Sequence, residues 1–186
     1  RLAGDPLDVL TFSGNGETTL HPEFPEIIED TLRLRDKYYP LAKVSVLTNA
    51  TRIFDPATAE ALKRVDNNIL KLDSAVEDTM RLIDRPASKD FTVERVVESL
   101  CQFGGTGIIQ TMLLRGEHCG RRIDNTTQEE IDALVDAYRR IRPKEVMIYS
   151  IDRSTPEENL VKVGKEELDR IASVIREAGI KVQGYE

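Results

Sequence analysis

Cysteine is scarce in this 186-residue sequence, which contains only Cys101 and Cys119. Two cysteines are too few for a disulfide framework and too few for a four-cysteine metal cage. The sequence also has no apolar run long enough to span a bilayer, and no basic segment followed by an apolar one that would form a leader peptide. We therefore expect a cytoplasmic protein that does not contact the membrane.

Basic residues are outnumbered by acidic ones, 26 to 33, which leaves a formal net charge of −7. Because phosphate binding needs clustered Lys and Arg, this balance argues against a broad nucleic-acid surface. It leaves open a small basic patch, or a tRNA held by another part of a longer chain. The apolar fraction of 40% and the charged fraction of 32% are typical of a globular protein large enough for one domain.

Short apolar runs alternate with amphipathic stretches along the whole chain, which is the βα pattern of a parallel sheet. The runs hardly alternate between apolar and polar residues, as expected for strands whose faces are covered. We predict an α/β fold, a partial barrel of parallel strands with outer helices, as one domain over residues 1–186. The expected strands are Asp8–Ser13, Lys43–Thr48, Ile69–Asp73, Gly107–Leu114, Glu145–Ile151 and Ile180–Tyr185.

Apolar residues at helical spacing predict the helices between these strands. Four apolar helix faces are predicted, and each consists of one of these sets: Phe24, Ile27, Ile28 and Leu32; Val93, Val96, Val97 and Leu100; Ile131, Leu134, Val135, Tyr138 and Ile141; and Leu168, Ile171, Ile175 and Ala178. Asp55-Pro56 is a helix start, and Thr127 with Glu130 fits a capping box. Gly179 stands where a helix end favours a positive φ.

Ligands of parallel α/β folds bind at the carboxyl ends of the strands, so the segments after the strands are the candidate sites. They are Ser13–Thr19, Thr48–Thr51, Asp73–Ala75, Arg115–Arg122 and Asp152–Thr155.

The first of these segments contains Gly14, Asn15, Gly16 and Glu17. Two glycines let the backbone approach a ligand, and Glu17 offers a carboxylate to an ammonium group. A glycine-rich turn with a solvated Glu17 is the plainer interpretation, since short glycine motifs are weak evidence. Thr48, Asn49, Lys71 and Asp73 add polar groups at the next two strand ends, where ordinary turns also place them.

Five segments in this order resemble one group of radical S-adenosylmethionine (SAM) iron–sulfur oxidoreductases, more distantly related to wyosine-type tRNA-modifying enzymes. The segments are TFSGNGETTLHPEF, VLTNAT, LKLDS, IIQTMLLRG and YSIDRSTPEENL. The resemblance covers about residues 8–185. It implies a partial or full (β/α) barrel, with SAM and a 4Fe-4S cluster at its mouth and a 5′-deoxyadenosyl radical as the reactive product.

The resemblance also implies a set of SAM-binding residues. Gly14, Asn15, Gly16 and Glu17 match the motif whose end binds the methionine ammonium group, and Thr48 and Asn49 match the strand end near the methionine. Lys71 and Asp73 match positions that face the carboxylate or the ribose. Gln110 and Tyr149 lie on strands whose backbone lines the adenine.

One departure from the family pattern is large, because the sequence has no Cys-x3-Cys-x2-Cys motif. Either the motif and the first barrel strand lie upstream of this chain, or the protein is a relative without a cluster. The first residue, Arg1, favours the fragment. Cys101 falls on an apolar helix face and is therefore predicted to be a core residue. Cys119, in a loop, is expected to be an exposed thiol, since one His-Cys pair supplies too few metal ligands.

Three functions stay open at this point. The first is the core of a radical SAM enzyme, whose partners would be its cluster-binding segment, a reductant such as flavodoxin or ferredoxin, and an unknown substrate. The second is a barrel-shaped small-molecule binding module without a cluster. The third is an interaction domain whose glycine motif is only a turn.

The cysteine content yields a direct prediction about metal. Reconstituted anaerobically with iron and sulfide, this chain is expected to hold no 4Fe-4S cluster, because two thiolates cannot replace three. Iron and sulfide analysis with the visible absorption spectrum measures it. Stoichiometric cluster absorbance that disappears in Cys119→Ser would contradict the prediction.

Overall fold

A computed structural model describes residues 6–14, 16–152, 157 and 159–184. The chain divides into two compact units, Arg1–Leu70 and Lys71–Glu186, and each is described by itself. Within the described residues, no helix is long and apolar enough to cross a membrane.

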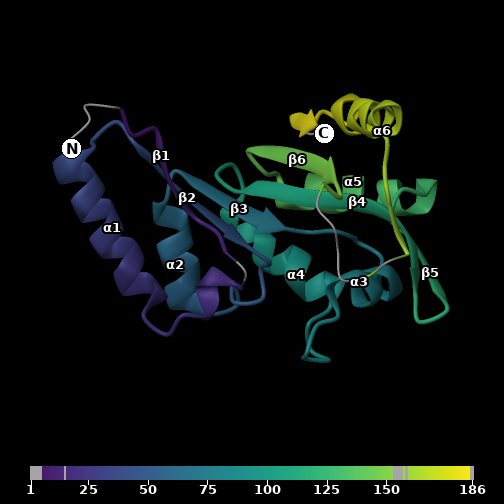
Figure 1. Cartoon of the computed structure of the whole chain (residues 1–186), viewed down its shortest axis with the longest axis horizontal. Helices are drawn as coiled ribbons and strands as arrows, with labels where there is room; N and C mark the ends of the chain where they lie inside the picture. The colour runs from purple at the N-terminus through teal and green to yellow at the C-terminus, as the bar shows by residue number, and fades with distance from the viewer. Residues whose placement is uncertain (1–5, 15, 153–156, 158, 185–186) are drawn as a thin grey trace. The chain divides into compact units, whose positions relative to one another are not determined.

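The first unit contains three parallel strands, β1 (Val9–Phe12), β2 (Lys43–Thr48) and β3 (Asn67–Lys71). The central strand is β2, which pairs Val9 with Lys43 on one side and Ser45 with Asn67 on the other. The helices of this unit are η1 (Thr18–Leu20), α1 (Phe24–Tyr38) and α2 (Pro56–Arg64). Helices α1 and α2 lie side by side (Figure 1).

The predicted signals of this unit are confirmed. Phe24, Ile28 and Leu32 form the buried face of α1. Asp55 caps α2, since its Oδ2 accepts the Thr58 N–H at 2.9 Å, and Pro56 occupies the first turn.

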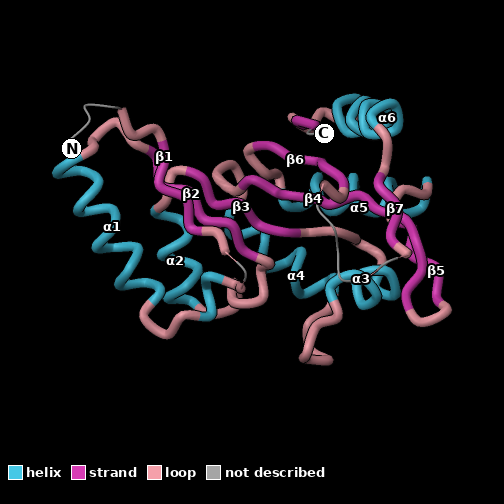
Figure 2. The backbone as a smooth tube through the Cα atoms, in the orientation of Figure 1, coloured by secondary structure: helices cyan, strands magenta, loops and turns pink. Residues whose placement is uncertain are grey.

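The second unit has its own parallel strands, β4 (Ile108–His118), β6 (Glu145–Ser150) and β8 (Val182–Gly184), with β6 between the other two. Two strands, β5 (Arg121–Asp124) and β7 (Leu160–Lys162), pair antiparallel with β4, beside its distal half (Figure 2). The helices are α3 (Glu77–Asp84), α4 (Val93–Leu100), η2 (Cys101–Phe103), α5 (Gln128–Ile141) and α6 (Lys165–Glu177).

The segment Arg115–Arg122, expected as a loop, is a β-hairpin. Strand β4 continues to His118 instead of ending at Leu114, and His118 pairs with Arg121. The chain at the start of β7 lies very close to Gly116, which pairs with Leu160. The φ of Gly116 is 146°, and a Cβ atom there would lie 2.2 Å from the Asn159 carbonyl oxygen. Only glycine permits that approach. The polar sequence Arg-Gly-Glu-His concealed this strand extension.

The prediction that Cys101 lies in the core is wrong, because the residue is exposed. Helix α4 ends at Leu100, and Cys101 begins the tighter turn η2. The change of helical period carries the cysteine off the apolar face, and the core positions are taken by Leu100 and Phe103, which are 0% and 1% exposed.

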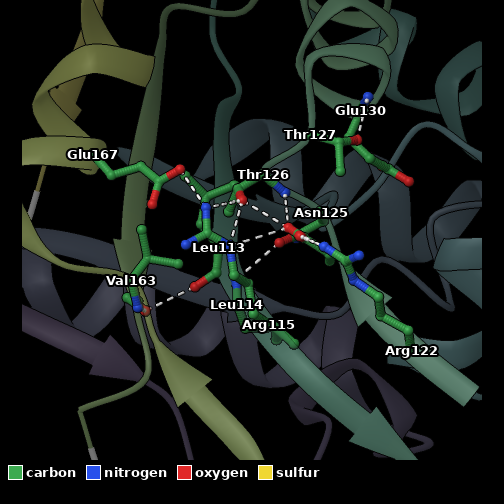
Figure 3. Close-up of polar contacts among 12 residues, drawn as sticks. Leu113, Leu114, Arg115, Arg122, Asn125, Thr126, Thr127, Glu130, Val163 and Glu167 are labelled. Atoms are coloured by element: carbon green, nitrogen blue, oxygen red, sulfur yellow. Dashed lines mark hydrogen bonds and ion pairs between the residues drawn. The ribbon is translucent and has the colours of Figure 1, made fainter.

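Asn125 fastens β4 to the segment after β3. The side chain is 0% exposed. Its Nδ2 donates to the carbonyl oxygens of Asp73 and Met112, both at 2.7 Å, and its Oδ1 accepts the Leu114 N–H at 2.8 Å. Beside it, Arg115 contacts Thr126 and Glu167 (Figure 3).

Asn125→Ala is expected to destabilise the protein by roughly 3 kcal/mol or more, because three buried backbone groups would lose their partner at about 1–3 kcal/mol each. Urea unfolding measures the loss. The control is Asn67→Ala, which removes a single side-chain bond to Ser45 Oγ at 2.9 Å and should cost about 1 kcal/mol. Equal losses in the two variants would contradict the role assigned to Asn125.

Candidate functional site

The carboxylate of Glu17 organises the loop after β1. Its Oε1 accepts the Thr19 N–H at 3.0 Å, the Thr19 hydroxyl at 2.5 Å and the Thr48 hydroxyl at 2.6 Å. Its Oε2 accepts the Asn49 N–H at 2.6 Å. The side chain therefore caps η1 and joins the β1 loop to the end of β2. The solvated side chain of the plainer interpretation is not what the structure shows.

Room for a further donor is left on one oxygen of this carboxylate. A carboxylate oxygen has about two lone-pair directions. Oε1 already has three donors, whereas Oε2 accepts the Asn49 N–H. An ammonium group that reached Oε2 would add a charge-assisted bond without displacing a protein donor.

The glycines of the same loop leave open space around the backbone. Among the described residues, apart from the chain neighbours, a Cβ atom on Gly14 or Gly16 would meet no atom within 4 Å, and both glycines are exposed. Packing within the protein therefore does not require glycine here, which fits a backbone surface kept free for a ligand. Asn15, predicted with them, lies outside the described residues.

The two predicted residues at the end of β2, Thr48 and Asn49, bind Glu17 and also stabilise the turn that follows the strand. The Thr48 hydroxyl donates to Glu17 and also accepts the Ala50 N–H at 3.1 Å. The Asn49 Oδ1 accepts the Thr51 N–H at 3.0 Å and the Thr51 hydroxyl at 2.7 Å. The Asn49 side chain thus stabilises the turn, and the residue is exposed.

Lys71 and Asp73 form an ion pair in the second unit. Asp73 is 1% exposed; its Oδ1 accepts the Met112 N–H at 2.8 Å, and its Oδ2 lies 2.8 Å from Lys71 Nζ in a charge contact rather than an aligned hydrogen bond. Burial acts to lower the pKa of Lys71, but the charge of Asp73 outweighs it and holds that pKa above its ordinary value. Lys71 is therefore a fixed cation.

Gln110 and Tyr149 lie on one face of the β4–β6 pair. Met112 is the register partner of Tyr149, and Gln110 is two residues from Met112, so their side chains share a face. Tyr149 is half-buried; burial raises the pKa of its hydroxyl, against the effect of Lys71. The tyrosine therefore stays protonated beside the ion pair. Thr111 points to the opposite face, where its hydroxyl meets Tyr138 at 2.6 Å.

Asp84 is a member of this group that sequence reasoning missed. It ends α3 and brings a second carboxyl group to Asp73. Burial of the carboxyl end and the negative charge of Asp73 raise its pKa to about 7, although much of the residue remains exposed. No sequence signal marked it, because helix α3 was not predicted.

Comparisons with known proteins place the fold. No family model matches the chain. It is 26% identical over 168 residues to the GTPase Obg of Brachyspira hyodysenteriae, covering 88% of this chain and 23% of that protein. A UPF0026 protein of Helicobacter pylori is 26% identical over 80% of this chain, and one of Synechocystis is 31% identical over 81%. The chain spans 45% and 52% of their lengths.

Solved structures of similar fold include a radical SAM methyltransferase and a protein bound to SAM. A domain of a pyruvate-formate lyase-activating enzyme from Bacteroides vulgatus has a TM-score of 0.70 at 14% identity, over 96% of this chain and 99% of that one. A radical SAM methyltransferase from Sphaerobacter thermophilus has 0.72 at 15%, over 99% and 52%. SuiB of Streptococcus suis, bound to SAM, has 0.67 at 15%, over 96% and 39%.

The chain has the fold of these proteins. The predicted fold class, a parallel α/β structure of the partial-barrel type, is confirmed by this likeness.

Asp84 gives a pH-dependent prediction. Its folded-state pKa is raised, so from roughly pH 4 to pH 7 the folded state binds more protons than the unfolded state, and stability falls as pH rises through that window. Asp84→Asn cannot ionise. It should be more stable than wild type above pH 7, with Tm higher by about 2–4 °C because solvent screening weakens the effect, and the difference should vanish near pH 4.

Thermal unfolding at pH 4, 6 and 8 measures this difference. Asp90→Asn, an exposed aspartate in the loop after α3, is the control and should leave the pH profile unchanged. A constant offset between Asp84→Asn and wild type at all three pH values would contradict the carboxyl pair.

Proposed function

We propose that this chain is the SAM-binding core of a radical SAM iron–sulfur enzyme of the oxidoreductase type. The observation that carries the proposal is the Glu17 carboxylate, which is fixed at a strand end by protein donors and keeps acceptor capacity on Oε2. The fold, shared with solved radical SAM proteins, supports it.

The Glu17 loop fits the amino-acid end of SAM. Glu17 Oε2 would accept the methionine ammonium group, and the open backbone at Gly14 and Gly16 would lie along the ligand. Asn15 and the exposed side chain of Asn49 would complete the first unit's part. As the family resemblance implies, Lys71 and Asp73 would face the carboxylate or the ribose of SAM. Gln110 and Tyr149 would lie on the strands that line its adenine.

The residues present do not fit an iron–sulfur cluster. Three thiolates are required, the sequence has two, and the described residues contain no group of three His, Cys, Asp or Glu side chains able to hold a metal. We propose that the cluster ligands come from a segment outside these 186 residues, and that a reductant such as flavodoxin or ferredoxin supplies electrons. The substrate is proposed to bind the assembled enzyme, and nucleic acid is the less expected class.

A second candidate is a binding module without a cluster, and the two-cysteine content favours it. The two candidates differ in what limits affinity. Cluster coordination normally anchors the methionine end of SAM, so a radical SAM core alone should bind SAM weakly. A binding module without a cluster should bind its ligand with full affinity when this chain is present by itself.

Glu17→Gln is expected to lower SAM affinity about ten- to a hundredfold, since it removes the charge from an ammonium contact of about 1.5–3 kcal/mol. The affinity is measured by titrating the protein with SAM up to millimolar concentration and recording the rise in melting temperature. The variant should also lose about 1–3 kcal/mol of stability, because an amide nitrogen would face donors that now bind the carboxylate.

Thr19→Val separates the two effects. It removes one bond to Glu17 Oε1 from a buried residue and leaves the charge in place. It should lose stability like Glu17→Gln and keep most of the SAM affinity. Equal affinity losses in the two variants would mean that Glu17 acts only by fixing the loop.

A further inference from the structure

The tip of the β4–β5 hairpin carries a cysteine in an unusual backbone conformation. Cys119 and Gly120 are the two residues between the register partners His118 and Arg121, and their φ angles are 50° and 74°. A two-residue turn with both φ positive is of the type I′ form, which favours Asn-Gly or Asp-Gly. A cysteine in this position costs about 1–2 kcal/mol relative to glycine.

The Cys119 thiol is the end of a three-residue array. Its Sγ lies 3.4 Å from His118 Nε2, and His118 Nδ1 lies 2.9 Å from Glu157 Oε2. The other oxygen of Glu157 is 3.0 Å from Arg85 Nη1. Thiol, imidazole and carboxylate therefore follow one another at contact distance, with the guanidinium behind the carboxylate.

The carboxylate decides which imidazole nitrogen carries the proton. The hydrogen bond from His118, and after it the charges of His118 and Arg85, hold the pKa of Glu157 below its ordinary value. An ionised Glu157 accepts a bond from Nδ1–H, which leaves Nε2 of a neutral imidazole as an acceptor facing the thiol. That arrangement of base and orienting group activates cysteine nucleophiles in general.

A small apolar pocket adjoins the array. Its volume is about 80 Å³, which suits a small substituent rather than a drug-sized ligand. Arg85, His118 and Glu157 provide its charged and polar lining, and the remaining lining is apolar, from Leu82, Ile83, Met112, Leu114, Ile123 and Leu160.

We propose that Cys119 is a nucleophilic thiol that exchanges with small disulfides bearing an apolar substituent. The His118–Glu157 pair serves as its base, and the pocket receives the substituent. This function is independent of SAM binding and uses no residue assigned to it.

The proposed step is balanced without any other reactant. The Cys119 S–H gives its proton to His118 Nε2, and the thiolate attacks one sulfur of R–S–S–R. A bond forms between Sγ and that sulfur, the S–S bond breaks, and R–S⁻ leaves and takes the proton from His118 as R–SH. The small disulfide is reduced and Cys119 is oxidised to a mixed disulfide. The leaving thiolate needs only a proton, which the imidazole holds.

Cys101 provides an internal comparison. It is also exposed, but its Sγ faces the Arg140 carbonyl oxygen at 3.6 Å, and a carbonyl cannot take a proton. The experiment uses Cys101→Ser, which leaves Cys119, and Cys119→Ser, which leaves Cys101. Each is reacted with 4,4′-dithiodipyridine at pH 7, folded and again in urea. The ratio of folded to unfolded rates removes the intrinsic chemistry of the probe.

We expect this ratio to be about tenfold higher for Cys119 than for Cys101. In the Cys101→Ser background, His118→Gln should lower the folded rate about fivefold or more, Glu157→Gln should lower it by less, and neither should alter the unfolded rate. Urea midpoints of these variants show that they fold. Equal ratios for the two thiols, or a folded rate unchanged by His118→Gln, would overturn the proposal.

Two further measurements test the pocket and the turn. The ratio should be higher for dithiodipyridine than for the charged probe oxidised glutathione, and equal ratios would overturn the role of the pocket. Cys119→Asn places a preferred residue in the turn. It should keep or raise the urea midpoint while Cys119 labelling disappears, and a lower midpoint would indicate that the cysteine is retained for structure.

Discussion

The buried carboxylate of Asp73 is the interaction on which the second unit depends. A carboxylate removed from water costs several kcal/mol unless a cation and hydrogen-bond donors compensate its charge, and Asp73 is 1% exposed. The Met112 N–H donates to its Oδ1, the Lys71 ammonium group lies 2.8 Å from its Oδ2 as a counter-charge, and Asn125 donates to the Asp73 carbonyl oxygen. Because these partners come from Lys71 at the start of the unit, from β4 and from the segment before α5, the position of each constrains the others. Removal of any partner leaves an uncompensated charge or dipole inside the unit.

The first unit uses the same device nearer the surface. Glu17 binds a loop residue, Thr19, and two residues at the end of β2. This carboxylate is only partly buried, so water can solvate what the protein leaves unsatisfied. The contrast explains why the charge of Asp73 is compensated inside the protein by the Lys71 ammonium group, whereas Glu17 can also rely on water.

The spacing of apolar residues in the sequence was sufficient to predict the helices and strands that pack against an apolar core. Strand β2 was predicted at its observed bounds, Lys43–Thr48, because a run of mostly buried residues ends at a polar turn. Periodicity failed where local geometry changes within a run. Cys101 has the spacing of a core residue, but the turn after Leu100 alters the helical period. The extension of β4 was missed because Arg115–His118 is polar in sequence, although its backbone pairs with β5 and the Arg115 side chain reaches Asp124.

The sequence was sufficient to predict which strand-end residues form the candidate site. It was not sufficient to predict their hydrogen-bond partners or which of them can bind a ligand. Asn125 and Asp84 were missed because their partners are backbone groups and a carboxylate distant in sequence, for which no local pattern exists. Sequence also cannot tell a polar group that binds a ligand from one that holds a turn, because the residue types are the same. The distinction requires the acceptor capacity left after the protein's own bonds are made.

That capacity is uneven among the predicted residues. Asn49 Oδ1 already accepts two bonds from Thr51, and both oxygens of Asp73 face donors or a cation. Glu17 Oε1 is filled by Thr19 and Thr48, whereas Oε2 has one short bond, from Asn49. An ammonium group therefore gains most at Oε2, where it adds a bond and replaces only water. At the other predicted oxygens it would have to displace a donor or a cation that the fold already uses, which supports the proposal that Glu17 Oε2 binds the ammonium group.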